Sequence, residues 1–172
     1  MLTPMETEID TGLLEPLETL VAPASTAAVV IGDFFKMNNG VKFASVFGEF
    51  KSRFFDKREK AVGEVTYRKY RLMGVSADGP IIAELGGESK VEGTVTAALR
   101  LLQRQGRGGP GYLQTNGYAN IFYAKDKKGV LCAIRIGWAE DGWVLDALPV
   151  KDPVAWNGEH EIFCPVADCG GS

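Results

Sequence analysis

Metal-binding and nucleophilic side chains are scarce in this sequence. Its 172 residues contain one histidine and three cysteines, Cys132, Cys164 and Cys169. Three cysteines leave at least one thiol unpaired, and the paired Cys-x-x-Cys knuckles of structural zinc sites are missing. We therefore expect reduced thiols, no cofactor and a cytoplasmic location when the protein is made.

A surplus of positive charge and long apolar runs are also lacking. The 19 lysines and arginines are outnumbered by 22 aspartates and glutamates, for a formal net charge of -3. This balance argues against a general nucleic-acid or anionic-membrane partner, because such binders need a basic surplus or stripe. No apolar run is long enough to span a bilayer, and no basic region precedes the first apolar residues, so we expect neither a membrane segment nor a signal peptide.

Length and composition favour one domain. A chain of 172 residues with 45% hydrophobic content can bury one substantial core, whereas two domains would be cramped. We expect a single globular α+β domain over residues 33–166, after a partly flexible N-terminal appendage over residues 1–32 and before a flexible tail over residues 167–172. Within the appendage, the pattern allows an amphipathic helix over Leu13–Val21 and a short buried strand over Ala27–Ile31.

Two amphipathic helices and one strand are expected before the last third of the chain. Phenylalanines 43, 47, 50 and 54 recur at helical spacing, which predicts a helix packed on a sheet. Ser89 and Glu92 form a capping box, so a second helix should begin there, carry an apolar stripe to Leu102 and end at Gly106. The alternating run over residues 63–73 predicts a strand whose charges discourage edge pairing. The glycine-rich residues 106–111 are expected to be a flexible connection.

The last third, from Gly117 to Cys164, holds all three tryptophans and the histidine. Turn signals over residues 126–129 and 139–142 separate three apolar and aromatic runs, which is typical of an antiparallel meander. The expected fold is therefore α+β, with a C-terminal antiparallel β-meander packed against one or two amphipathic helices.

The second turn sets the register of a hairpin. If Trp138 and Trp143 flank a four-residue loop, they face each other, and alternation puts an apolar set on one side. That core side carries Val130, Cys132, Ile134, Ile136, Trp138, Trp143, Leu145 and Ala147. The opposite side is mixed and carries Leu131, Ala133, Arg135, Gly137, Val144, Asp146 and Leu148. Arg135 and Asp146 should pair across the strands, while Val144 and Leu148 need a second contact, from another segment of the chain or from a protein or ligand.

Several motifs in this stretch carry a family resemblance. TNGYANIFY, GVLCA, a tryptophan followed by DGW, and a proline followed by a tryptophan resemble the C-terminal module of a group of uncharacterised bacterial proteins. The likeness continues upstream through PIIAELGGE and LLQRQGRG, and covers about residues 43–163. Members of the group differ mainly at alternating positions, which is similar to the adenine-directed variation of diversity-generating retroelements. By analogy, the resemblance implies a C-type-lectin-like fold.

The resemblance also implies a set of variable positions. They correspond to Cys132, Arg135, Gly137, Ala139, Val144, Asp146, Leu148, Val154, Ala155, Asn157 and His160. Five of them lie on the mixed side of the hairpin. The assignment of residues to that side depends on strand alternation alone and makes no use of the resemblance. The chain departs from the group at Gly158, which stands one place early and leaves the register of the closing strand open.

We therefore expect a ligand-binding surface built from Arg135, Gly137, Ala139, Val144, Asp146, Leu148, Asn157 and His160, with the three tryptophans as core anchors. A zinc site at His160, Cys164 and Cys169, with Cys132 as a fourth donor, has ligand-like spacing but no knuckle. A Cys-His nucleophile lacks an oxyanion loop, and the acidic residues at positions 141–161 are typical of a solvated surface.

These observations favour a non-enzymatic protein that binds an unknown protein or small ligand through a diversifiable surface on its C-terminal hairpin. The alternative is a structural or assembly protein, phage-like or oligomeric, that buries the same surface between subunits. Both hypotheses are compatible with a homo-oligomer.

Overall fold

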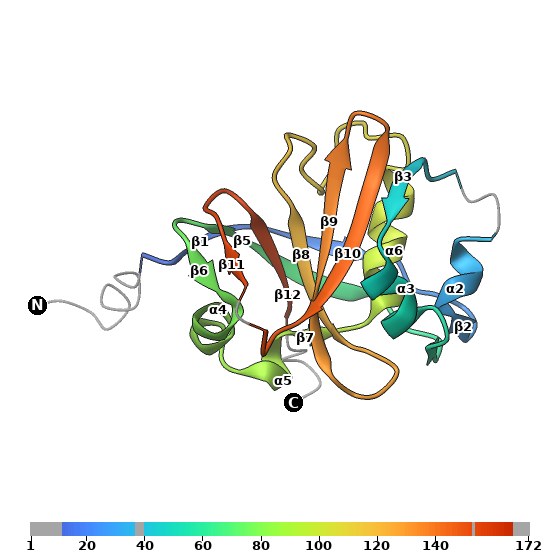
Figure 1. Cartoon of the computed structure of the whole chain (residues 1–172), viewed down its shortest axis with the longest axis horizontal. Coiled ribbons are helices and arrows are strands. Elements are labelled where there is room, and N and C mark those ends of the chain that lie inside the picture. The colour runs from blue at the N-terminus through green and yellow to red at the C-terminus, as the bar shows by residue number, and fades with distance from the viewer. Residues whose placement is uncertain (1–11, 37–39, 153, 167–172) are drawn as a thin grey trace, which may run out of the picture.

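A mostly antiparallel eight-stranded sheet organises the chain (Figure 1). The computed structural model describes residues 12–36, 40–152 and 154–166. Seven strands follow the order β1-β5-β12-β8-β9-β10-β3, and β7 pairs with the far end of β8. Their bounds are β1 Leu14–Ala22, β3 Phe43–Val46, β5 Val65–Leu72, β7 Glu92–Gly93, β8 Asn120–Lys125, β9 Leu131–Ala139, β10 Gly142–Pro149 and β12 Glu161–Pro165.

Helices cover both faces of this sheet, which makes the fold α+β. The first face packs against α2 (Ile31–Phe34), α3 (Gly48–Phe54) and α6 (Val95–Arg104). The second face packs against α4 (Asp78–Glu84) and α5 (Glu88–Val91). Two short ladders, β2 (Val29–Val30) with β4 (Arg58–Glu59) and β6 (Ser76–Ala77) with β11 (Ala155–Trp156), complete the described structure. None of the described helices is long and apolar enough to cross a membrane.

The N-terminal segment is part of the sheet. Residues 14–22, which the sequence analysis placed in an appendage with a helix as one option, form β1 and pair antiparallel with β5. Leu20 and Ala22 belong to the core cluster that includes α6. The strand forms at the edge of a sheet that would otherwise end at β5, and it buries Leu14 before, and Leu20 and Ala22 after, a register shift between Pro16 and Thr19. Residues 1–11 and 167–172, which include the predicted tail, lie outside the described residues.

The phenylalanine run is a strand followed by a helix, so the predicted continuous helix is wrong. Phe43 begins β3, which pairs parallel with β10, and Phe47 precedes α3. Phe50 and Phe54 do share a helical face, and their rings stack 5.2 Å apart in the core. Pairing with a neighbouring strand overrides the helical spacing of the first two rings, because it satisfies backbone groups there.

Helix α6 forms as its apolar stripe predicts, but it begins later than the capping box indicated. Thr94 is the N-cap and its Oγ1 accepts from the amide of Ala97 at 3.2 Å. The buried Glu59 carboxylate accepts from the Val95 and Thr96 amides at 3.0 and 2.8 Å. The predicted box fails because Glu92 lies in β7, where it pairs with β8 instead of reaching back to Ser89.

The charges on the strand at residues 63–73 do not mark an edge. This strand, β5, lies between β1 and β12. Lys69 is buried, and its Nζ lies 3.0 Å from Glu161 Oε1 and 3.2 Å from Glu18 Oε2, while it donates to the Tyr112 carbonyl at 2.8 Å. The expectation that these charges discourage pairing is wrong, because carboxylates from distant parts of the chain pair with Lys69 and let both neighbouring strands bind β5.

The glycine-rich segment after α6 is closely packed at Gly106 and Gly108, which corrects the expectation of a flexible connection there, whereas a Cβ at Gly109 would meet nothing within 4 Å. A Cβ at Gly106 would lie 2.2 Å from the Gly40 carbonyl oxygen, and one at Gly108 would lie 2.5 Å from the Trp138 indole. Gly108 also has a φ of +79°. Glycine is therefore required here by close approach and backbone conformation.

Candidate functional site

The C-terminal hairpin has the predicted register. Strands β9 and β10 pair Trp138 with Trp143, Gly137 with Val144 and Arg135 with Asp146. Gly142 in the turn has a φ of +133°, and a Cβ there would lie 2.6 Å from the Lys42 carbonyl oxygen. Only glycine can therefore occupy this position of the turn without strain.

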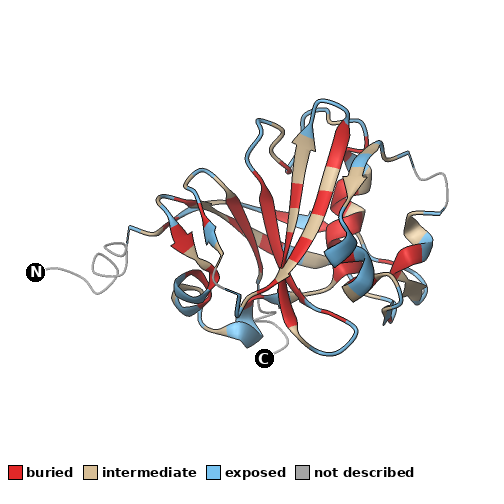
Figure 2. Ribbon diagram, in the orientation of Figure 1, coloured by how far each residue is buried: buried red, intermediate tan, exposed pale blue. Residues whose placement is uncertain are grey.

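The core side of this hairpin is also confirmed. Figure 2 shows buried and partly exposed positions alternating along β10 and along residues 134–137 of β9, whereas residues 131–134 of β9 are all buried. Trp143 is fully buried and donates from Nε1 to the Gln105 carbonyl at 2.8 Å. Trp138 is half-buried and packs edge-on against Trp143, with ring centroids 5.2 Å apart. All eight predicted core residues belong to or pack against the cluster that contains α6.

The opposite side of the hairpin divides into two parts. Near the base, Leu131 and Ala133 are buried in the cluster that includes α4 and α5, so another segment of the chain covers them. Farther along, six residues are partly or fully exposed and form what we call the outward hairpin face: Arg135, Gly137, Ala139, Val144, Asp146 and Leu148. Val144 and Leu148 pack into neither core cluster of the described chain. Among the described residues, the chain therefore covers Leu131 and Ala133 on this side of the hairpin and leaves the other six partly or fully exposed.

Arg135 and Asp146 form the expected ion pair on the outward hairpin face. Arg135 Nη2 lies 3.3 Å from Asp146 Oδ2, with side-chain exposures of 40% and 18%. Asp146 Oδ1 also accepts from the Ala147 amide at 2.8 Å, which fixes the carboxylate. A pair this exposed contributes at most about 1 kcal/mol to stability. It fixes the orientation of two opposite charges more than it stabilises the fold.

His160 lies beside this face. It immediately precedes β12, and its Nδ1 accepts from the Ala119 amide at 2.8 Å, so Nδ1 carries no proton. Burial of half the ring and the nearby Arg135 charge lower the pKa of His160. The imidazole is therefore neutral at pH 7.

Aromatic rings fix the loop that carries His160. Tyr118 and Trp156 contact the imidazole edge-on, with centroids 5.7 and 5.8 Å away. Trp156 is buried and donates from Nε1 to Asp78 Oδ1 at 2.8 Å, and the same oxygen accepts from the Tyr123 hydroxyl at 2.7 Å. The expectation that Trp156 is a core anchor is confirmed.

Asn157 follows this anchor directly and is exposed. A Cβ at the next residue, Gly158, would make only ordinary van der Waals contact with the backbone at Gly74. The closing strand, whose register the shifted glycine left open, pairs Glu161 with Asn120 of β8. We call the outward hairpin face together with Asn157 and His160 the recognition surface. The half-exposed Tyr118 joins it, and sequence reasoning missed this residue although it stands inside the TNGYANIFY motif.

The described cysteines lie apart from this surface. Cys132 is fully buried on the core side, although the resemblance placed it among the variable positions. Burial raises the pKa of its thiol to about 11, and burial likewise raises the pKa of Cys164. Both are therefore protonated at pH 7 and poorly suited to nucleophilic attack. Within residues 12–36, 40–152 and 154–166, no three histidine, cysteine or acidic side chains gather as a metal site, and Cys169 lies outside these ranges.

Comparison of the chain with protein-family models, curated proteins and solved structures gives no match. The assignment of the recognition surface therefore depends on strand parity, burial and contacts within this chain.

Proposed function

We propose that the protein is a non-enzymatic binding protein and that its recognition surface contacts a protein or a small ligand. The observation that carries the proposal is the state of Val144 and Leu148. Both are apolar and partly exposed, and both pack outside the two core clusters of the described residues. What supports a contact surface is the combination of these two side chains with fixed charges on one strand face, because contact surfaces combine apolar and polar groups.

The chemistry of the surface supports recognition. Val144 and Leu148 offer apolar area, while the Arg135–Asp146 pair offers a donor and an acceptor in fixed positions. His160 adds a neutral imidazole held by Tyr118 and Trp156. Interfaces gain most of their affinity from a few such apolar and aromatic groups, and orientation from charged groups around them.

Diversification of this surface is part of the proposal. Strand parity separates the outward hairpin face from the packed side, so changes at Arg135, Val144 or Asp146 leave the hairpin core untouched. We attribute to this face the type of variation produced by diversity-generating retroelements. The C-type-lectin-like fold that the resemblance implies belongs to the same proposal, supported by the mixed α+β sheet.

A stability comparison tests whether the face is independent of the fold. The double variant Val144→Ser/Leu148→Ser should unfold within about 1 kcal/mol of wild type, because partly exposed side chains lose little burial. The matched control Leu145→Ser changes a buried residue of the same strand and should cost about 3 to 5 kcal/mol. Urea unfolding followed by tryptophan fluorescence measures both. A double variant as unstable as the control would place Val144 and Leu148 in the core and refute the proposal.

A binding experiment tests recognition itself. The labelled full chain is applied to printed arrays of glycans and of peptides, beside the double variant and Arg135→Ala. Signals that both variants lose, while a Val21→Ser control on β1 keeps them, would support the proposal. Signals that the hairpin variants retain would place binding elsewhere, and arrays without any signal would count against glycan and peptide ligands.

Sedimentation at several protein concentrations separates recognition from assembly. A monomer from about 1 to 100 µM leaves the face free for a ligand. A dimer that the double variant dissociates would instead establish the structural alternative, in which Val144 and Leu148 are buried between subunits.

A further inference from the structure

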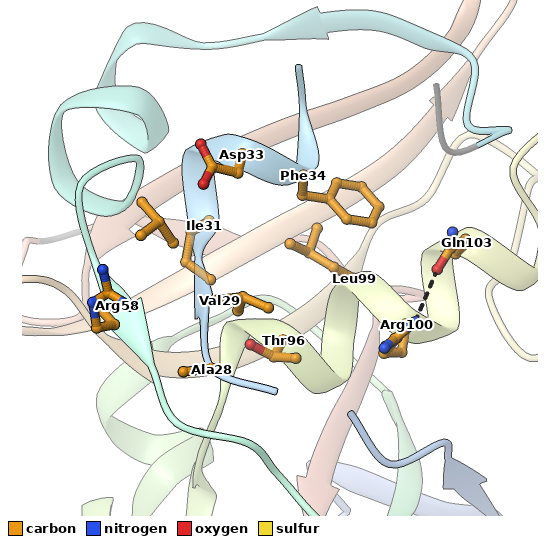
Figure 3. A pocket seen from close by; sticks show the side chains of 11 residues that line it. Ala28, Val29, Ile31, Asp33, Phe34, Arg58, Thr96, Leu99, Arg100 and Gln103 are labelled. Atoms are coloured by element: carbon orange, nitrogen blue, oxygen red, sulfur yellow. Dashed lines mark hydrogen bonds between the residues drawn. The ribbon is translucent and has the colours of Figure 1, made fainter. Parts of the chain in front are cut away.

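A cavity lies on the other side of the sheet from the outward hairpin face, between α6 and the β2–α2 segment. The cavity measures about 390 Å³, within the range of small-molecule sites. Its apolar lining includes Val29, Ile31, Phe34 and Leu99 (Figure 3). Ile31 and Leu99 are buried, so the floor of the cavity is continuous with the core. The residues come from three separate segments of the chain, and no sequence motif marked them.

Two arginines flank this apolar lining. Figure 3 shows Arg58, from β4, and Arg100, from α6, on opposite sides of the aliphatic side chains. Neither guanidinium pairs with a carboxylate in residues 12–36, 40–152 or 154–166. Arg100 makes only a long 3.5 Å contact with Gln103 Oε1. By contrast, Arg53, Arg71 and Arg135 each have an acidic partner.

Two carboxylates near the cavity, those of Asp33 and Glu59, have partners other than the two arginines. Asp33 is the only acidic residue of the lining, and its Oδ1 lies 3.5 Å from Lys36 Nζ. Glu59, the neighbour of Arg58, turns inward to bind the first amides of α6 and the Thr96 hydroxyl. The lining therefore carries one net positive charge above an apolar floor. Guanidinium groups in such a position can bind a carboxylate in a bidentate manner.

We propose that this cavity binds a small organic anion with an apolar body, of the alkyl carboxylate class. The apolar part lies on Val29, Phe34 and Leu99, and the carboxylate reaches Arg58 or Arg100 at the rim. This site is separate from the recognition surface, because α6 packs on the core side of the hairpin. The proposal stands or falls independently of the proposed function.

Isothermal titration of the full chain with a series from butanoate to octanoate tests the proposal. Octanoate should bind saturably with one site per chain and a Kd below about 1 mM. Affinity should rise about threefold to fourfold for each added methylene until the floor is covered. The neutral 1-octanol should bind at least about tenfold more weakly, because it lacks the charged contact.

Variants identify the groups responsible. Arg58→Gln and Arg100→Gln retain most of the side-chain stem, and at least one of them should weaken octanoate about fivefold to tenfold while leaving 1-octanol unchanged. Arg104→Gln removes the same charge from an exposed position of α6 outside the lining, and should have no effect. Ala28→Phe enlarges an exposed residue at the rim and should abolish binding of both compounds without changing the melting temperature.

Several results would overturn this assignment. Octanoate that fails to saturate below about 10 mM would show that the cavity is not a site of this kind. Equal affinity for octanoate and 1-octanol would exclude a contact between an arginine and the carboxylate. Equal effects of Arg104→Gln and the two lining variants would show that only the overall charge of the protein affects binding. Binding that survives Ala28→Phe, or that Val144→Ser/Leu148→Ser removes, would place the ligand elsewhere.

Discussion

The buried carboxylate of Asp78 should determine how firmly the loop of the recognition surface is held. Its Oδ1 accepts from the Trp156 indole at 2.8 Å and the Tyr123 hydroxyl at 2.7 Å, and the residue is only 2% exposed. In Asp78→Ala, both donors lose their acceptor away from water. Each buried unsatisfied group costs about 1 to 3 kcal/mol, so we expect a total loss of about 2 to 6 kcal/mol for the two donors.

The isosteric variant separates the acceptor oxygen from the charge. Burial raises the pKa of Asp78 above its ordinary value of 3.8, although the two hydrogen bonds oppose the shift. Folding thus disfavours the charged carboxylate relative to the unfolded state, and Asp78→Asn, which keeps one acceptor oxygen, should remain within about 1 kcal/mol of wild type at pH 7. The exposed Glu64→Ala serves as a control for loss of a negative charge.

The pH dependence provides a third comparison. A raised folded pKa means that the folded state binds the proton more tightly than the unfolded state. The stabilising contribution is complete below pH 3.8 and is lost as the pH rises through the folded pKa. Between pH 7 and pH 4, wild type should therefore gain stability relative to Asp78→Asn as the pH falls. Urea unfolding followed by tryptophan fluorescence measures each difference.

Two outcomes would refute this reasoning. An Asp78→Ala variant as stable as wild type would mean that Trp156 and Tyr123 find other acceptors or water. An Asp78→Asn variant as unstable as Asp78→Ala would mean that the negative charge, rather than the acceptor oxygen, holds the two donors.

Further predictions concern the packed glycine and the buried lysine. Gly108→Ala should cost at least about 1 to 3 kcal/mol in thermal unfolding, because its Cβ would meet the Trp138 indole at a φ of +79°, whereas Gly109→Ala, in open space, should be nearly neutral. A melting temperature unchanged by Gly108→Ala would contradict that packing. Lys69→Met should cost about 2 to 4 kcal/mol in urea unfolding, since buried Glu161 loses the nearer of its two cationic partners and keeps only Arg71 at 3.7 Å. A loss below about 1 kcal/mol would show that Arg71 alone compensates that carboxylate.

Elements with a strong local signal could be predicted from the sequence. The hairpin register follows from one turn and two flanking tryptophans, because the side-chain period of a strand is two and a slip would expose the whole core side. The body of α6 follows from its apolar stripe. Both features depend on residues close together in the chain.

Elements decided by distant partners could not be predicted. The first turn of α6 is bound by Glu59, which comes from β4, and the charge of Lys69 is balanced by Glu161 from β12. A capping box and a charged strand are local patterns, so neither contains the information about these contacts. The cavity beside α6 has the same origin, because β2, α2, β4 and α6 form it only after the chain has folded.

Cys132 limits how far the variable surface can extend. The resemblance places variation there, yet the side chain is fully buried on the core side, with Sγ 3.5 Å from the Val130 carbonyl and 4.0 Å from Asp126 Oδ2. A buried position cannot touch a ligand, so change there would affect binding only by shifting β9 against α6. Under the proposed function, parity and burial together confine direct contacts of the hairpin to the outward hairpin face, from which buried Leu131 and Ala133 are excluded. Stability and the proposed recognition would then depend on opposite sides of the same two strands.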